Sequence, residues 1–390
     1  MGKIAIKGPS AETAAVPKES TKQQSAVKEE PKAVLPEKNG FALISKYRGA
    51  IMGFAAIWIL FFHEWIVLSE TDQTVIGWTE RFLKRTGFCG VDIFLFLSGM
   101  GLTYAIKKAS LGKFYYNRLK RLLFPFIFVA VIRCFMEDWK LFDFIGNVTG
   151  YNFYTKSMYS FLWFVPAITT FYILFPAYNS LFNKSSNKLL FTAGAFELWL
   201  LWSLFVRDDL RGDLYGFTNR IPIFLIGIYV GYLCQNKKYE FTKTTWVYIF
   251  LTMLLGGYLS YLANYKGLYI LVPVSNCCIP NMLMAMSLPF LLAKALDILC
   301  TKDYLKTFGN GLNKVLCFFG GFSLEFYCIQ EWLSGQLKPK FLEDFAPLTV
   351  NLLIFVCVTV VALLMSYVGK FIWDIVDKII FRKPAKAKKA

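Results

Sequence analysis

SKYRGAIMGFAAIWILFFHEW, residues 45–65, is the most informative segment of the sequence. It is mostly apolar and has about the 20-residue length of a helix that crosses a bilayer. Arg48 lies near its start and His63 near its end, and His63 is the single histidine of the chain. An ionisable residue inside a membrane segment is by default a functional hypothesis. The stretch predicts a membrane helix that ends in a functional histidine; a satisfied core histidine is the alternative.

The composition extends this interpretation to the whole chain of 390 residues, which is 56% hydrophobic and 18% aromatic. Soluble domains are less apolar than this. The net charge is +17, but the basic residues lie in short segments between apolar runs. That distribution is typical of the positive-inside rule and argues against nucleic-acid binding. The expected fold is an all-α, polytopic transmembrane helix bundle, with the lipid bilayer as its partner.

About ten spans are predicted, and the alternation of basic and acidic connections places both termini in the cytoplasm. The strongest cytoplasmic marker is the segment 107–121, expected as a loop, which has basic residues and no acidic one. Pro273, Pro280 and Pro289 are expected to interrupt the eighth span. The predicted spans are about 50–68, 89–106, 122–136, 161–178, 189–206, 221–234, 245–262, a segment within 268–299, 315–333 and 348–368.

Three parts follow along the chain. Residues 1–44 are rich in Lys, Glu, Pro and Ser and predict a disordered cytoplasmic tail. Residues 45–370 form the predicted transmembrane domain, and residues 371–390 a basic cytoplasmic tail. The nine cysteines include no C-x-x-C pair and have no histidine cluster beside them, so no metal site is predicted.

The second span opens with GVDIFLFLSG, residues 90–99. Asp92 is expected at the outer start of this span, at about the depth of His63. A carboxylate beside an imidazole fixes its tautomer and stabilises the imidazolium. Asp92 is therefore a candidate orienting group for His63, and an interfacial helix cap is the alternative.

Arg118 and Arg121 form an R-x-x-R pair just before the third span. Arginine binds phosphate in a bidentate manner and keeps its charge. The pair is a candidate phosphate site; ordinary positive-inside charge or contact with lipid head groups is the alternative.

These motifs, with LWF at 162–164 and SLEFY at 323–327, resemble the acyltransferase-3 family of integral membrane O-acyltransferases. The resemblance covers nearly all of residues 45–370. It implies transfer of an acyl group, commonly acetyl, from cytoplasmic acyl-CoA to a hydroxyl of a carbohydrate or lipid-linked glycan. It further implies a multi-pass protein of the bacterial cell membrane with no permanently bound cofactor.

The resemblance also implies roles for particular residues. His63 would be the general base for the acceptor hydroxyl or would carry the acyl group transiently, with Asp92 orienting it. Arg118 and Arg121 would hold the CoA phosphates. The weaker candidates for substrate binding are Arg48, Trp163, Glu325 and Gln330.

Two positions depart from the family pattern. Met52 stands where the family has an arginine, with Arg48 one turn earlier, and Gln330 stands where many members have a second histidine. A transporter or flippase of glycolipids or acyl compounds remains an alternative, since ten spans, a broken helix and buried charge suit it too. A catalytically inactive membrane sensor is the other alternative.

Overall fold

The computed structural model describes residues 39–157, 161–206, 214–236, 240–267 and 278–380. In these residues the regular structure is entirely helical. The helices are α1 (Gly40–Glu64), α2 (Val75–Thr86), α3 (Cys89–Lys108), α4 (Leu111–Met136), α5 (Leu141–Val148), α6 (Tyr151–Thr155), α7 (Phe164–Lys184), α8 (Lys188–Val206), α9 (Tyr215–Thr218), α10 (Ile221–Asn236), α11 (Lys243–Tyr265), α12 (Cys278–Thr301), α13 (Lys306–Gly321), α14 (Ser323–Asp344) and α15 (Pro347–Ile380).

Six helical segments are long and apolar enough to cross a membrane: Gly40–Glu64, Cys89–Lys108, Gly216–Asn236, Lys243–Tyr265, Cys278–Thr301 and Pro347–Ile380. The count becomes seven if α13 and α14 together form one broken span. The chain is therefore a multi-pass membrane protein, as its composition predicts.

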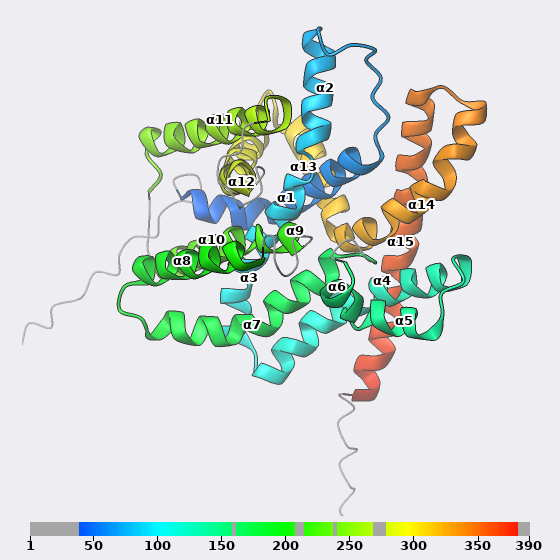
Figure 1. Ribbon diagram of the computed structural model, residues 1–390. Helices are drawn as coiled ribbons and strands as arrows, with labels where there is room; N and C mark the ends of the chain where they lie inside the picture. The colour runs from blue at the N-terminus through cyan, green and yellow to red at the C-terminus, as the bar shows by residue number, and fades with distance from the viewer. Residues whose placement is uncertain (1–38, 158–160, 207–213, 237–239, 268–277, 381–390) are drawn as a thin grey trace, which may run out of the picture. The chain divides into compact units, whose positions relative to one another are not determined.

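Helix α1 is the hub of the described bundle, in contact with α3, α12, α13 and α14 (Figure 1). Its closest neighbour is α13. A Cβ atom at Gly53 would overlap the carbonyl oxygen of Leu316, and one at Gly320 would overlap the carbonyl oxygen of Gly49. Small residues let membrane helices approach backbone to backbone, so this contact fixes where α1 lies in the bundle.

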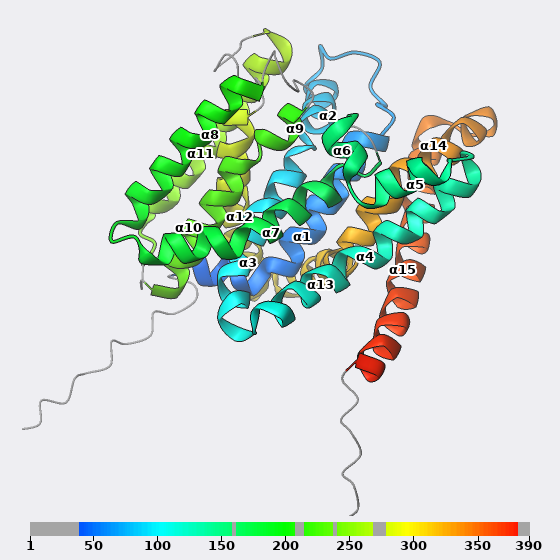
Figure 2. The same cartoon turned by 60° about the horizontal axis from the view of Figure 1, so that its bottom comes forward.

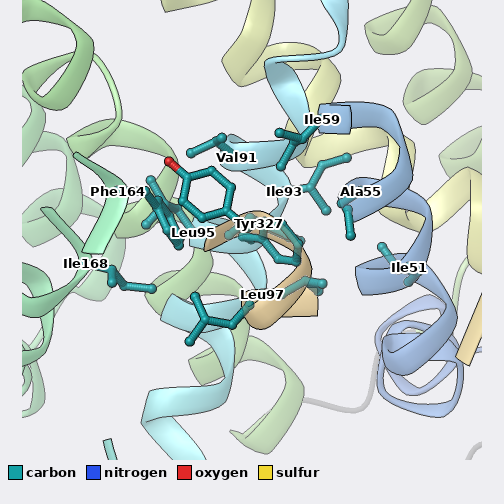
Figure 3. Close-up of a cluster of buried hydrophobic side chains, with 14 of the residues drawn as sticks. Ile51, Ala55, Ile59, Val91, Ile93, Leu95, Leu97, Phe164, Ile168 and Tyr327 are labelled. Carbon is teal, nitrogen blue, oxygen red and sulfur yellow. The ribbon is translucent and has the colours of Figure 1, made fainter. Parts of the chain in front are cut away.

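The interior around α1 is apolar. Ile51, Ala55 and Ile59 of α1 pack with Ile93 and other side chains of α3, and α7 and α14 complete the cluster (Figure 3). This packing holds Arg48, more than two turns inside α1, and His63, in its last turn, in fixed positions relative to α3, α7 and α14.

Several predicted boundaries are wrong. Helix α1 begins at Gly40, inside the predicted tail, because Asn39 caps it by accepting hydrogen bonds from the N–H groups of Phe41 and Ala42. Helix α15 continues to Ile380, well beyond the predicted end of the membrane domain. The remaining parts of the two predicted tails, residues 1–38 and 381–390, lie outside the described residues.

Two basic connections predicted between spans, 107–121 and the one after the eighth span, are also largely helical rather than loops. Helix α4 begins at Leu111, with Ser110 as its cap, so Arg118 and Arg121 lie on a helix. Helix α13 begins at Lys306, between the predicted eighth and ninth spans. Charge shows on which side a segment is expected to lie, but basic residues are good helix formers and do not end a helix.

The broken helix is elsewhere than predicted. Helix α12 continues through Pro289, and Pro280 lies in its first turn, where proline is tolerated. Pro273 lies outside the described residues. The break falls in the predicted ninth span, where α13 and α14 meet at Phe322 with a bend of 72°.

Candidate active site

A cavity of about 640 Å³ opens beside the end of α1. His63 and Trp163 both lie in its wall. The wall alternates charged with aromatic side chains: His63, Arg133, Asp143, Lys156, Arg220, Glu331, Trp139, Phe161, Trp163 and Tyr327. A cavity of this size with convergent polar groups is the usual form of a small-molecule site.

His63 lies in the last turn of α1. Its imidazole forms no hydrogen bond with another side chain in the described parts of the chain, which leaves both ring nitrogens available to a ligand. The charges that act on it belong to Glu331, Lys84 and Lys338. Glu331 is the one carboxylate among them, and it lines the same cavity.

Lys84 reaches this region from α2, and its ammonium donates a hydrogen bond to the carbonyl oxygen of Trp65. Burial, and then the charge of Lys338, lowers the pKa of the Lys84 amine. Lys338 itself lies 2.9 Å from a carboxylate oxygen of Glu64. The end of α1 is thus surrounded by paired charges, whereas His63 faces the cavity.

Asp92 is not the partner of His63. It is 3% exposed, and its Oδ1 lies 3.8 Å from Nε of Arg220. Asp92 does not face His63 because of the way α3 is rotated about its own axis. Gly90 faces α1, where a Cβ would lie 2.7 Å from the carbonyl oxygen of Ala55. Asp92, two residues on, is turned by about 200° and faces another neighbour.

Arg220 links Asp92 to the cavity. Its guanidinium lies 4.8 Å from the ring centroid of Trp163, and the side chain lines the cavity wall. The second oxygen of Asp92 has no hydrogen-bond partner among the described residues. Sequence reasoning missed Arg220; the available signal was a lone arginine directly before the apolar helix α10.

The chain turns sharply before Trp163. Leu162 has a φ of 45°, a left-handed conformation that is unfavourable for a branched side chain. Helix α7 begins at Phe164, so the turn presents Trp163 to the cavity while Phe164 packs inward, 5.2 Å from the ring of Tyr327 (Figure 3). Strain of this kind is common where the fold holds a functional side chain.

A second, narrow pocket of about 50 Å³ lies deeper along α1. It brings together Arg48 of α1 with Arg118 and Arg121 of α4. The buried Nε groups of Arg48 and Arg118 have no hydrogen-bond partner among the described residues. Three like charges with unused donors form a site that an anion would stabilise.

Tyr327 lines both the narrow pocket and the large cavity. It therefore forms the partition between the arginine site and the His63 site. Arg48 and His63 are roughly 22 Å apart at the helical rise of α1, so only a long, thin molecule could reach both.

The remaining predicted residues, Glu325 and Gln330, do not line the large cavity. Glu325 lines a third cavity, with Arg121, between α4 and α15. Gln330 is 1% exposed, and its side-chain oxygen has no partner among the described residues. Its neighbour Glu331 lines the large cavity. No group of three or more possible metal ligands occurs in the ranges the structure describes.

A comparison with known families shows to which family the chain belongs. The acyltransferase-3 family, whose profile describes an acyltransferase domain, matches residues 51–370. The chain belongs to this family and is a membrane acyltransferase that transfers groups other than aminoacyl groups. No curated protein and no solved structure gives a significant match.

Proposed function

We propose that the protein transfers an acyl group, commonly acetyl, from cytoplasmic acyl-CoA to a hydroxyl of a carbohydrate or lipid-linked glycan. The observation that carries this proposal is a pair of neighbouring sites that share Tyr327 in their walls, with three arginines on one side and His63 on the other. Acyl-CoA is a long molecule with a phosphate-rich end and a reactive thioester at the other end, which matches that polarity.

The donor would bind with its phosphates at Arg48, Arg118 and Arg121. Arginine makes paired hydrogen bonds to phosphate oxygens, and the unused Nε donors of two of these residues could contribute to them. The pantetheine arm would then pass Tyr327 and bring the thioester toward His63.

The acceptor would occupy the large cavity. Trp139 and Trp163 offer flat apolar faces, while Arg133 and Lys156 offer donors at its edge. A sugar ring has both apolar faces and polar edges, so this mixed wall suits a glycan whose hydroxyl accepts the acyl group. His63 would remove the proton from that hydroxyl as it attacks the thioester carbon, and the CoA thiolate would leave.

The proposed topology has about ten spans with both termini in the cytoplasm, in a bacterial cell membrane. Helices α4, α7 and α8 are 26, 21 and 19 residues long. Added to the six spans named above and the broken span of α13 and α14, they would make up about ten spans.

The test is acyl transfer by the purified protein, measured as CoA release from acetyl-CoA in the presence of a glycan acceptor. Arg118→Ala and Arg121→Ala should each raise the KM for acetyl-CoA about tenfold, because each removes a charge-assisted phosphate contact. Lysine at either position should restore only part of the loss, since a point charge lacks the fork geometry.

Lys113→Ala is the matched control, because it removes an exposed positive charge from the same helix outside the arginine pocket. Unchanged KM values in both alanine variants, with normal protein abundance, would refute the phosphate role. Absence of acetyl-CoA binding by the wild-type protein would refute the donor.

A further inference from the structure

The third cavity, of about 320 Å³, lies between α4 and α15 and shares Arg121 with the arginine pocket. The two helices lie side by side in both views (Figures 1 and 2). The wall residues used below are Asn117, Lys120, Arg121, Lys370, Trp373 and Asp374. The donor and acceptor sites proposed above do not include this cavity.

Trp373 is held firmly in the wall. Gly369, one turn earlier, allows α15 to approach α4, because a Cβ there would lie 2.6 Å from the ring of Phe124. Tyr116 packs edge-on against the indole, with ring centroids 6.2 Å apart at 87°. Lys120 lies 5.9 Å from the indole centroid. The ring is thus positioned before any ligand arrives.

Two features of this cavity are unsatisfied. The indole Nε1–H of Trp373 is buried without a hydrogen-bond partner among the described residues. Arg121 and Lys370 form no ion pair with any residue in the described ranges, although both line the wall. An aromatic surface, an unused donor and free positive charge together indicate a ligand that has both an aromatic ring and phosphate.

The wall also contains the carboxylates of Glu325 and Asp374. A simple polyanion, including an anionic lipid head group, would be repelled by both. The phosphates of an adenine nucleotide would be repelled as well, but its exocyclic amino group and ribose hydroxyl can donate hydrogen bonds to these carboxylates, which a simple polyanion cannot do.

We propose that this cavity binds the adenosine 3′,5′-bisphosphate end of the acyl-CoA donor, with the adenine stacked on Trp373. The inference rests on the proposed function, because it assumes a CoA donor. Lys370 and Arg121 hold the nucleotide phosphates. Because Arg121 also lines the narrow pocket, the pantetheine arm of the donor continues from Arg121 into that pocket. The donor then spans all three cavities in sequence, from Trp373 past Arg121 and Tyr327 to His63.

The experiment combines two variants with two donors. Acetyl-CoA carries the nucleotide, whereas S-acetyl-4′-phosphopantetheine lacks it. Trp373→Ala should raise the KM for acetyl-CoA about tenfold, the loss expected for one stacked base. The same variant should leave the KM for S-acetyl-4′-phosphopantetheine unchanged, and Trp373→Phe should keep most of the affinity for acetyl-CoA.

Phe371→Ala is the matched control, because it removes an aromatic ring from α15 that is 67% exposed and outside this cavity. It should change neither KM. Adenosine 3′,5′-bisphosphate alone should compete with acetyl-CoA in the wild-type protein and much less in Trp373→Ala.

The failure of this subsite is distinguishable from the failure of the proposed function. If wild type uses acetyl-CoA in an Arg118-dependent manner but Trp373→Ala affects both donors equally, or neither, the nucleotide subsite is wrong and the donor stands. If wild type binds no acetyl-CoA, and Trp373 instead governs binding to phosphatidylglycerol vesicles, both proposals fall and the cavity holds a lipid head group.

Discussion

His63 shares its cavity with Glu331, whereas the carboxylate expected beside it, Asp92, pairs with Arg220. As the single imidazole of the chain, His63 can be tested without a substitute. His63→Ala and His63→Gln should both lose nearly all transfer, because glutamine can hydrogen-bond but cannot take the proton. In wild type the rate should fall at acidic pH as the imidazole becomes protonated. Near-normal transfer by either variant, at normal abundance, would contradict the role of His63.

Glu331 and Asp92 should give opposite phenotypes. Glu331→Gln should lower kcat while leaving the melting temperature unchanged, because the side chain lines the cavity near His63. Asp92→Asn should lower the melting temperature, because removing one partner of a buried ion pair costs roughly 3–5 kcal/mol. Kinetics and thermal unfolding in detergent, run on both variants, measure the difference. A lower kcat in Asp92→Asn with an unchanged melting temperature would return the orienting role to Asp92.

At the scale of residues, the direction in which a side chain points could not be predicted from the sequence. His63 and Trp163 line the large cavity and the arginine pair lines the narrow pocket, and the roles that the family resemblance implies for them stay predictions. The error at Asp92 arose because the rotation of a helix about its axis is set by packing, here by the contact of Gly90 with α1. The sequence also could not predict that Arg48 lies beside the arginines of α4, because this contact depends on which helices become neighbours.

At the scale of elements, the close contact between α1 and α13 gives a stability test. Gly53→Ala places a methyl group against the backbone carbonyl of Leu316, which cannot move as a side chain would. Overpacking of this kind should cost about 1–3 kcal/mol and lower the melting temperature. Gly257→Ala is the matched control, because a Cβ at Gly257 meets nothing within 4 Å. A Gly53→Ala protein as stable as the Gly257→Ala protein would mean that α1 and α13 pack less closely.

Glu80 of α2 holds the segment that follows α1. The Glu80 carboxylate accepts hydrogen bonds from the Trp65 indole at 2.7 Å and from the backbone N–H groups of Leu68 and Ser69. Burial alone would raise the pKa of Glu80, but these hydrogen bonds together lower it below its usual value. A lowered pKa means that folding gains stability from the ionised form at neutral pH, and this gain disappears as pH falls through the folded-state pKa.

Acidification below the usual range of glutamate should therefore release residues 66–74, with increased cleavage there by pepsin. Glu80→Gln should show the same cleavage already at mildly acidic pH, because the amide replaces one acceptor oxygen with a donor group. Cleavage that is identical in wild type and Glu80→Gln at every pH would show that Glu80 does not hold the segment.

The elements themselves were largely predictable, because long apolar runs cannot avoid becoming helices in a bilayer. Their ends and breaks were not. The bend at Phe322 has no proline beside it, and α12 passes through Pro289 unbroken. The bend does follow the pair Gly320 and Gly321, a local signal for a break that the prediction did not use. The continuity of α12 at Pro289 depends on tertiary packing, which a local sequence pattern does not contain.

For the whole molecule, the topology determines whether donor and acceptor meet from opposite sides. If Arg118 lies at the cytoplasmic face, His63 lies roughly 22 Å further along α1 than Arg48, toward the outer face. Acyl-CoA would then enter from the cytoplasm, and the acceptor would be acylated at the outer side. This arrangement requires an even number of spans between two cytoplasmic termini.

Reporter fusions measure this directly. A cytoplasmic reporter such as green fluorescent protein should be active after Lys113 and at the C-terminus, and alkaline phosphatase should be active after Asp143. Lys238 should behave as Lys113 does and Asp209 as Asp143 does; both lie outside the described residues. An external C-terminus would make the span count odd. Cytoplasmic placement of Asp143, which lines the large cavity, would put the acceptor site on the same side as the donor, and transfer across the bilayer would be excluded.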